Sequence, residues 1–258
     1  MSESVRLDKY LADVGIGTRS EVKNYIRKGR VQVDDVIVKE SDMKINTKTS
    51  SVLFDNTRVA YETYEYFMLN KPAGVVSATR DNVSTTVVEL IREGTCKGDD
   101  SEVESFVIKD LFPVGRLDKD TEGLLLITND GDLAHRLLSP KKHVAKTYFA
   151  QIKGKVTMDD VRVFKEGIEL SEDFTTLPAE LKIIESDEAL ESDEVSEVEV
   201  TIFEGKFHQV KRMFEAVEKE VIYLKRLSMG ELVLDKDLNP GEFRRLTPEE
   251  LSKIKGTK

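Results

Sequence analysis

The sequence predicts an α+β protein in two parts: a small module of two helices and a hairpin, then a larger domain with a mixed, largely antiparallel sheet. Two observations lead to this prediction. The first sixty residues contain two helical apolar stripes followed by a Val-x-Val strand pattern. The rest of the chain consists mainly of short apolar runs separated by turn residues. We therefore expect domains at residues 1–60 and 61–258, joined by a linker near residues 55–64.

Two helices and a hairpin are predicted for the first domain. The first helix is indicated by apolar residues at helical spacing, namely Leu7, Tyr10, Leu11 and Val14. Thr18 is placed to cap a second helix and Gly29 to end it. That helix carries a basic face made of Arg19, Lys23, Arg27 and Lys28. Alternating apolar residues predict a hairpin turned at Asp34-Asp35: Val31, Val33, Ile37 and Val38.

In the second domain, strands alternate with short helices. Apolar runs bounded by turn residues predict strands at residues 66–70, 124–128, 146–152, 179–185, 197–203, 221–228 and 231–234. Apolar stripes with capping or stop residues predict helices at residues 85–91, 132–138, 157–167, 207–217 and 246–255. In the last helix, Thr247 is the expected cap and Pro248 suits the first helical position.

The composition is that of a soluble globular protein, with 39% hydrophobic and 34% charged residues. No apolar run approaches the ~20 residues that span a bilayer, and the N-terminus lacks an apolar signal core, so we expect a cytoplasmic protein without a membrane partner. The single cysteine, Cys96, has no partner for an internal disulfide. Three scattered histidines do not suggest a zinc site. We expect neither a metal nor a cofactor.

The net charge of −10, taken alone, argues against a nucleic-acid partner, but the charge is unevenly distributed. Residues 169–199 hold twelve Asp or Glu and one Lys, so this segment alone carries −11 and the rest of the chain +1. A phosphate-binding face can therefore lie elsewhere. The segment is interpreted as a solvated hairpin or loop, or alternatively as an acidic patch that steers RNA toward its proper binding face.

The string at residues 115–131 is the most informative in the chain. It places Asp118 between Arg116 and the turn Thr121-Glu122-Gly123, just before an unbroken apolar strand. A carboxylate at such a junction is held beside a cleft, where a catalytic acid or nucleophile belongs. An isolated Asp is more often a turn or helix-start residue. The whole string, however, resembles the signature of the pseudouridine synthases, in their RsuA-like branch. The resemblance implies that Asp118 is the single essential catalytic residue.

Three further strings resemble the same family in the expected order: residues 69–74, 146–148 and 204–214. The resemblance implies that Tyr148 lies on the target uracil and that Val210 packs against its ring. It also implies that Lys211 pairs with the catalytic Asp, with the adjacent Arg212 as the alternative. Lys71 lies in a predicted turn, and from there it can reach a phosphate. Each string alone is weak, since a strand Tyr is usually a core residue and a basic amphipathic helix is common.

The family reaction converts a uridine in RNA to pseudouridine and needs no redox group. The resemblance implies that the target nucleotide is turned out of the RNA, that Arg116 fills the vacated stack or holds a phosphate, and that Thr121 helps shape the loop that aims Asp118. Asp118 acts on the ribose, either by attack at C1′ or by removing the C2′ proton. His208 and Gln209 are expected to contact the RNA backbone or orient their loop.

The first domain resembles the S4 domain, a small RNA-binding module. The matching residues are Arg6-Leu7-Asp8, Thr18-Arg19-Ser20, Ile26, Gly29, Val31 and Val33. Arg and Lys on one helix face can meet successive phosphates of an RNA backbone. We expect the RNA-binding residues of this domain to be Arg6, Arg19, Lys23, Arg27 and Lys28.

The combination of an S4 domain with this catalytic core resembles the enzymes that act on ribosomal RNA. The string at residues 139–148 looks more like small-subunit than large-subunit enzymes, and a long basic tail is lacking. We therefore expect the target to be 16S rRNA, at uridine 516 in the helix-18 region. The substrate is either free RNA or an assembling small subunit. We also expect a monomer and no DNA partner. The alternatives are a 23S rRNA target, a non-catalytic RNA-binding assembly factor, or an unrelated hydrolase that uses Asp118. The segments 93–105 and 185–199 look like branch-specific insertions.

Overall fold

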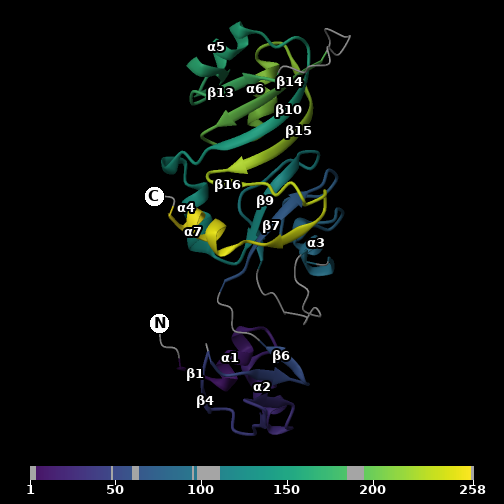
Figure 1. Cartoon of the computed structure of the whole chain (residues 1–258), viewed down its shortest axis with the longest axis vertical. Coiled ribbons are helices and arrows are strands. Elements are labelled where there is room, and N and C mark those ends of the chain that lie inside the picture. The colour runs from purple at the N-terminus through teal and green to yellow at the C-terminus, as the bar shows by residue number, and fades with distance from the viewer. Residues whose placement is uncertain are drawn as a thin grey trace. The chain divides into compact units, whose positions relative to one another are not determined.

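The computed structural model describes residues 4–47, 49–59, 64–94, 96–97, 111–184 and 195–256 (Figure 1). The chain divides into two compact units, residues 1–65 with 98–111 and residues 66–97 with 112–258. The predicted boundary at residue 60 lies at the start of the undescribed stretch 60–63. Most of the segment 93–105, interpreted above as an insertion, also lies outside the described residues. Each unit is described by itself below.

The first unit packs two helices on small antiparallel sheets. Its elements are β1 (Ser4–Arg6), α1 (Leu7–Asp13), α2 (Arg19–Arg27), β2 (Val31–Val33), β3 (Val36–Ile37), β4 (Lys44–Asn46), β5 (Val52–Phe54) and β6 (Thr57–Val59). Strands β3, β2, β5 and β6 form one sheet in that order, and β1 pairs with β4. Thr18 and Glu21 form a capping box at the start of α2, as the sequence predicted for Thr18. The helices, the β2–β3 hairpin and its Asp34-Asp35 turn are confirmed.

The linker predicted near residues 55–64 is wrong at its start. Residues Thr57–Val59 form β6, which pairs with β5 across a turn at Asp55 and Asn56. Both turn residues have a positive φ, at 50° and 64°, which Asp and Asn adopt more readily than most residues. A polar turn of this kind resembles the beginning of a linker in sequence, but here it closes a hairpin of the first unit.

The second unit combines helices with one large sheet and a small hairpin. Its helices are α3 (Val87–Glu93), α4 (Gly131–Leu138), α5 (Met158–Glu166), α6 (Gln209–Glu215) and α7 (Pro248–Gly256), with a 3-10 turn at Pro140–Lys142. Its strands are β7 (Tyr66–Lys71), β8 (Phe112–Pro113), β9 (Glu122–Thr128), β10 (Lys146–Lys153), β11 (Glu169–Ser171), β12 (Phe174–Thr175), β13 (Glu180–Ile183), β14 (Val195–Ile202), β15 (Glu220–Met229), β16 (Leu232–Val233) and β17 (Phe243–Arg245). The predicted α+β class is confirmed.

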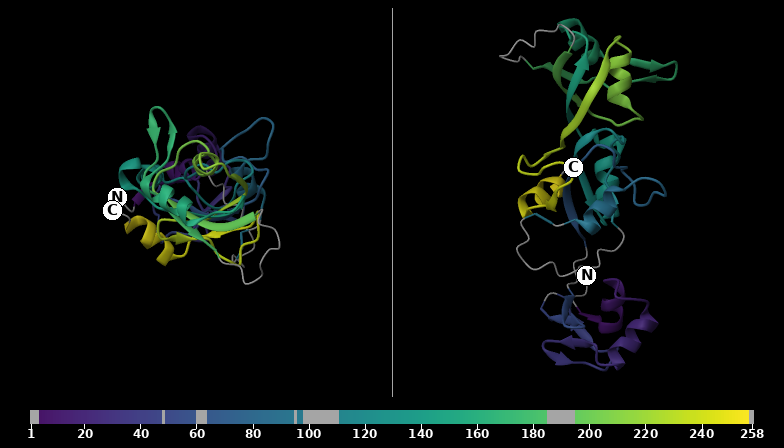
Figure 2. Two further views of the ribbon diagram at one scale, coloured as in Figure 1. Left: turned by 90° about the horizontal axis from the view of Figure 1, so that it is seen from above. Right: turned by 90° about the vertical axis from the view of Figure 1, so that its right-hand side faces the viewer.

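The large sheet consists of two antiparallel halves that meet at one short parallel contact. Its strand order is β13-β14-β10-β15-β9-β7-β17, with β16 paired to β15 and β8 to β9. Only β9 and β15 run parallel, with Glu122 opposite Lys225 and Gly123 opposite Arg226. We call this contact the seam. In the views of Figures 1 and 2 the strands on the two sides of the seam form distinct blocks. The loop that carries Asp118 leads into β9 at the seam, because Glu122 and Gly123 begin that strand.

The seam requires a glycine at position 123. The φ angle of Gly123 is +100°, and a Cβ atom would lie 2.3 Å from the carbonyl oxygen of Arg226. We therefore expect Gly123→Ala to lower the free energy of unfolding by about 3 kcal/mol, through strain and a lost seam contact. Urea denaturation of Gly123→Ala measures this, beside Gly131→Ala, whose added Cβ meets no atom within 4 Å. Equal stability of the two variants would contradict a close-packed seam.

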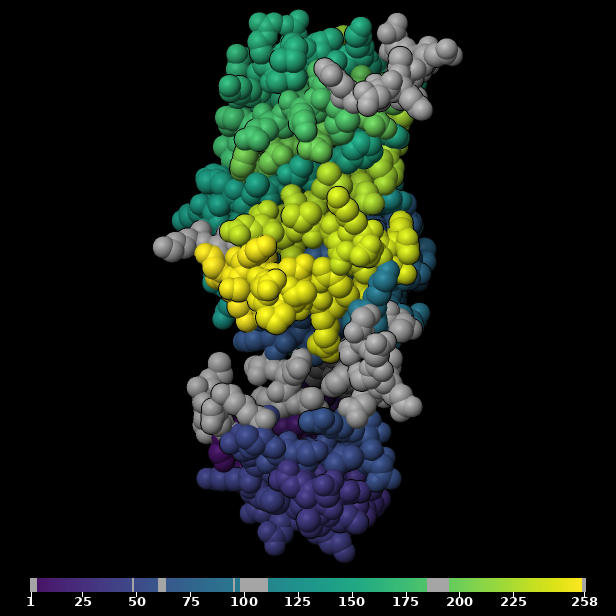
Figure 3. Space-filling view, in the orientation of Figure 1, coloured from purple at the N-terminus to yellow at the C-terminus, as the bar shows by residue number. Residues whose placement is uncertain are grey.

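Helices cover parts of the sheet and close its core. Helix α6 packs on β15 and α5 on β13 (Figure 2). Helix α7 inserts Ile254 into the core while most of its residues remain at the surface, where Figure 3 shows the C-terminal segment in yellow. Thr247 caps α7 by accepting a hydrogen bond from the amide of Glu250, as expected. Strands β13 and β14 form the predicted antiparallel hairpin around the acidic segment, whose residues 185–194 lie outside the described chain.

Candidate active site

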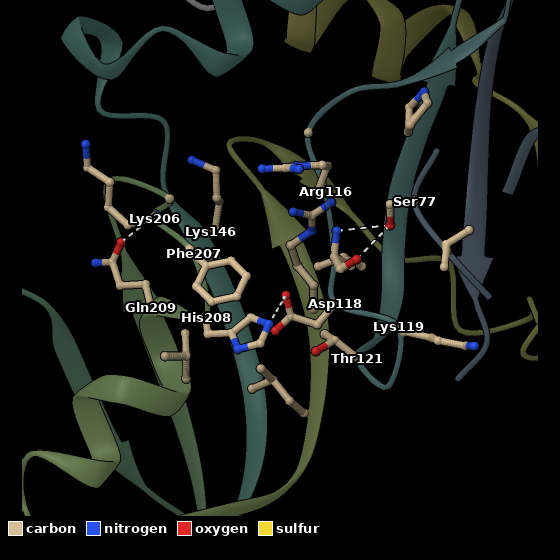
Figure 4. Close-up of a pocket in the computed structure, with 18 of the residues that line it drawn as sticks. Ser77, Arg116, Asp118, Lys119, Thr121, Lys146, Lys206, Phe207, His208 and Gln209 are labelled. Carbon is tan, nitrogen blue, oxygen red and sulfur yellow. Dashed lines mark hydrogen bonds and ion pairs between the residues drawn. The ribbon is translucent and has the colours of Figure 1, made fainter. Parts of the chain in front are cut away.

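A cleft of about 750 Å³ opens along the seam, between the Asp118 loop and the start of α6 (Figure 4). Its charged lining is strongly basic: seven Lys or Arg residues face one carboxylate, that of Asp118. The seven are Arg80, Arg116, Lys119, Lys146, Lys206, Lys211 and Arg226. A protein of net charge −10 therefore concentrates positive charge in its cleft, which suits a polyanionic ligand such as RNA.

Backbone contacts fix the loop that carries Asp118. The Ser77 hydroxyl donates to the carbonyl of Leu117 at 2.8 Å and accepts from its amide at 3.1 Å. The amide of Gly74 donates to the carbonyl of Lys119. The Asp118 side chain is 28% exposed, so it faces the cleft while its backbone is held on both sides. This is the rigid placement beside a cleft that the sequence predicted.

Lys71 also holds this loop, through hydrogen bonds from inside the protein. It is completely buried, and its ammonium donates to the carbonyls of Pro72, Lys119 and Thr121 at 3.0, 3.2 and 2.8 Å. Burial lowers its pKa to about 8, which leaves it mostly protonated at neutral pH. The expectation that Lys71 reaches an RNA phosphate is wrong, because all three of its donors are spent on loop carbonyls inside the protein.

Two basic side chains from the loop before α6 and from α6 itself approach Asp118. His208 Nε2 lies 3.5 Å from Asp118 Oδ1, and Lys211 Nζ lies 3.7 Å from Asp118 Oδ2. Lys211 makes its shorter contacts to Asp120, at 2.7 and 2.8 Å, and this hydrogen bond lowers the pKa of Asp120. Lys211 is thus shared between two carboxylates, and Asp120 was not foreseen as its main partner.

Arg212, the alternative to Lys211, does not serve this role. Its guanidinium donates to the carbonyl of Leu170, and it is not among the residues that line the cleft. The neighbouring Gln209 is buried and ties the loop together: it donates to the Glu204 carboxylate and accepts from the Lys206 amide. Gln209 therefore orients its loop, one of the two roles expected for it.

The remaining predicted substrate residues are brought together in the cleft. Tyr148 on β10 and Val210 on α6 both line it, at 7% and 4% exposure. Arg116 lies exposed at the cleft, next to Asp118 in Figure 4. Thr121 is buried in the lining, and its hydroxyl has no hydrogen-bond partner among the described residues. The geometry therefore allows a base on Tyr148, beside Val210, with the ribose toward Asp118.

Sequence reasoning missed several cleft residues, among them Phe207 and Arg226. Phe207 is 73% exposed and stacks on His208 with ring centroids 3.8 Å apart. An aromatic residue in an amphipathic pattern is ordinarily assigned to the core, so its exposure gave no signal. Arg226 is only 2% exposed yet lines the cleft from β15. The readable signal was an Arg inside the strand predicted at residues 221–228, since buried Arg residues are rare.

Comparison with known proteins identifies the family of each domain. Residues 65–216 match the profile of the RNA pseudouridylate synthase family, and residues 5–49 match that of the S4 domain. The chain belongs to the RNA pseudouridylate synthase family. Such an enzyme is an isomerase that converts uridine in RNA to pseudouridine. The matched segment contains Asp118, Tyr148 and Lys211, so the predicted family is confirmed, and so is the S4 domain.

The matches to relatives extend over nearly the full chain. An uncharacterized RNA pseudouridine synthase, YtzG, of Bacillus subtilis is 44% identical over 96% of this chain and 97% of its own length. The ribosomal small subunit pseudouridine synthase A of Vibrio cholerae is 40% identical over 97% of this chain and 99% of its own length. The ribosomal large subunit pseudouridine synthase B of Bacillus subtilis is 36% identical, with coverages of 97% and 95%. A crystal structure of pseudouridylate synthase aligns with a TM-score of 0.61 at 36% identity, covering 97% of this chain and 99% of that one.

The S4 domain of this pseudouridine synthase presents basic residues around a buried carboxylate. Arg6 pairs with Asp8 at 2.9 Å and Lys23 lies 3.8 Å from the same carboxylate, and the hydrogen bond from Arg6 lowers the pKa of Asp8. Arg19, Arg27 and Lys28 are exposed, and within the described ranges none of them forms an ion pair. Their charges are therefore open to an RNA backbone.

We expect combined replacement of Arg19, Lys23 and Arg27 by Ala to weaken RNA binding about tenfold or more. The log–log salt dependence should flatten by about 2, because each lost phosphate contact removes ~0.7–0.9 from the slope. Titration of the full-length variant with labelled 16S rRNA at several salt concentrations measures both effects. A control replaces three exposed lysines elsewhere in the domain, namely Lys9, Lys39 and Lys44. Equal effects of the two triple variants would rule out a specific basic face.

The described residues contain neither a membrane-spanning helix nor a cluster of metal ligands. None of their helices is both long and apolar enough to span a membrane. The same residues contain no cluster of three or more His, Cys, Asp or Glu side chains that could hold a metal ion.

Proposed function

We propose that this pseudouridine synthase isomerises a uridine of ribosomal RNA, and specifically uridine 516 in the helix-18 region of 16S rRNA. The observation that carries the activity is the single carboxylate, Asp118, in a cleft with seven basic residues and a Tyr beside it. The 16S target is supported by the 40% identity to the small-subunit enzyme of Vibrio cholerae over nearly both full lengths. A 23S target stays the second candidate, because the large-subunit enzyme of Bacillus subtilis aligns over a similar length at 36% identity.

The chemistry balances without a further reactant. The C1′–N1 bond breaks, the uracil turns, and a C1′–C5 bond forms while the C5 proton leaves and N1 gains a proton. Asp118 is the group placed to act on the ribose, with the Lys211 ammonium and the His208 imidazole within 4 Å of its carboxylate. Tyr148 offers a face for the turned-out base, a contact worth about 1–3 kcal/mol. Arg116, exposed at the cleft, is free to meet the RNA that the base has left.

The S4 domain contributes affinity rather than chemistry in this proposal. Its exposed Arg19, Arg27 and Lys28 suit backbone phosphates of the same ribosomal RNA. Such contacts carry no sequence information, so the choice of uridine rests with the shape of the RNA around the target and with the cleft.

The experiment that tests the substrate is pseudouridine mapping of ribosomal RNA. Carbodiimide treatment and primer extension are applied to RNA from a strain that lacks the gene and from its parent. We expect one 16S signal to disappear and to return with the wild-type gene, but not with Asp118→Asn. Loss of a 23S signal instead would overturn the 16S assignment. Unchanged signals throughout ribosomal RNA would overturn the proposal as a whole.

A further inference from the structure

Two basic residues share one face of the sheet with Tyr148. In the antiparallel pairing of β10 and β15, Tyr148 lies directly opposite Arg226. Lys146 precedes Tyr148 by two residues, and side chains two apart on a strand point to the same side. All three residues line the cleft. The position expected for the uracil is therefore bordered by a lysine and an arginine that no role yet explains.

Arg226 is placed firmly but left incompletely bonded. It is 2% exposed, and its Nε donates to the carbonyl of Leu124 at 2.8 Å across the seam. Its Nη2 is buried and has no hydrogen-bond partner within the described ranges. Leaving a buried donor on a charged group unpaired costs about 1–3 kcal/mol or more. An oxygen of a ligand bound in the cleft would supply the missing acceptor.

Lys146 adds a second positive charge at the same place. Its Nζ donates to the carbonyl of Val144 at 2.9 Å. Burial, joined by the nearby charge of Arg226, lowers the pKa of Lys146 to about 8, while Glu204 acts in the opposite direction. No carboxylate lies within 4 Å of Lys146 or Arg226 in the described part of the chain. Figure 4 draws the amino group of Lys146 in the cleft, between Lys206 and Arg116.

We propose that Lys146 and Arg226 form a subsite for a backbone phosphate of the target nucleotide, next to the base position on Tyr148. Two uncompensated cations match the charge of a phosphate better than a neutral uracil carbonyl, and a guanidinium offers two parallel donors to its oxygens. Anchoring that phosphate would hold the nucleotide out of the RNA stack while Asp118 acts on its ribose. The inference rests on the proposed function, since it assumes that the turned-out nucleotide enters this cleft.

The test combines a neutralised phosphate with truncated side chains. The probe is a synthetic RNA covering the helix-18 loop of 16S rRNA, with single methylphosphonates placed in turn at each linkage of the loop. Binding is measured in the Asp118→Asn background, so that no turnover occurs. We expect one linkage at which the methylphosphonate weakens binding about tenfold, the size expected for losing a charge-assisted contact. At that linkage the penalty should fall below about twofold in Lys146→Met and in Arg226→Lys.

A matched control is Lys153→Met, which truncates an exposed lysine of the same strand outside the cleft. It should keep the full methylphosphonate penalty and an unchanged salt slope, whereas Lys146→Met should lower the slope by about 0.7. Thermal unfolding shows whether Arg226→Lys folds, and Lys146→Met carries the test alone if it does not. An identical penalty in the Asp118→Asn parent and in both variants made in that background, at every linkage, would overturn the subsite. If the wild-type enzyme, which retains Asp118, leaves this RNA unmodified, that result counts against the proposed target. The binding comparison would still decide the subsite.

Discussion

Asp118→Asn is expected to abolish pseudouridine formation, by about 10³-fold or more, while RNA affinity stays within about twofold. The amide has the size of the carboxylate, and the loop is held by backbone contacts to Ser77 and Gly74 that the change leaves intact. The change removes the negative charge that we propose acts on the ribose. Single-turnover assays of 16S rRNA by primer extension, with binding by filter retention, measure the two effects separately.

The matched control is Asp120→Asn in the same loop. The side chain of Asp120 is 72% exposed, and it accepts a hydrogen bond from the ammonium of Lys211. We expect less than a tenfold loss of activity, because Lys211 still lies within reach of Asp118. An inactive Asp120→Asn together with an active Asp118→Asn would reverse the assignment of the catalytic carboxylate.

Lys71→Met is expected to lower both stability and turnover. The change removes the donor shared by the carbonyls of Pro72, Lys119 and Thr121, and it leaves them unsatisfied in the interior. We expect a loss of about 3 kcal/mol in the free energy of unfolding. The loosened loop should lower kcat by about 10²-fold with KM little changed, since small displacements of a reacting group are costly. Urea denaturation and steady-state kinetics measure these effects.

Lys119→Met serves as the control for Lys71. Lys119 is an exposed residue of the same loop, and among the described residues its ammonium donates to the hydroxyl of Ser84. Its replacement should leave stability within about 0.5 kcal/mol of wild type. If Lys71→Met instead raises KM and flattens the salt dependence while the fold stays intact, Lys71 contacts RNA and the bracing role is wrong.

Local sequence signals were sufficient for the framework of the site. The capping residues Thr18 and Thr247 begin α2 and α7 as predicted. The unbroken apolar run after Asp118 becomes the buried strand β9. These features depend on neighbours in the sequence, where spacing and composition carry the information. The fold class could be predicted for this reason, whereas the family was indicated by the resemblance of four strings, among them residues 115–131.

The failures concern the direction of long charged side chains. Lys71 points into the protein and Arg212 toward Leu170, whereas Arg226 faces the cleft from a strand. Which way such a chain turns is set by packing between β9, β15 and α6, which are far apart in sequence. The sharing of Lys211 between Asp118 and Asp120 arises in the same way. Sequence spacing places these residues near the site but does not say what their ends touch.

This enzyme moves the glycosidic bond of uridine from N1 to C5. The most direct test of this reaction is to measure the loss of the C5 hydrogen. Unmodified 16S rRNA transcribed with [5-³H]uridine is incubated with the purified protein, and released tritium is counted. We predict release of one equivalent per 16S molecule by wild type and none by Asp118→Asn. No release from 16S or from equally labelled 23S rRNA, by a protein that binds them, would contradict the claim.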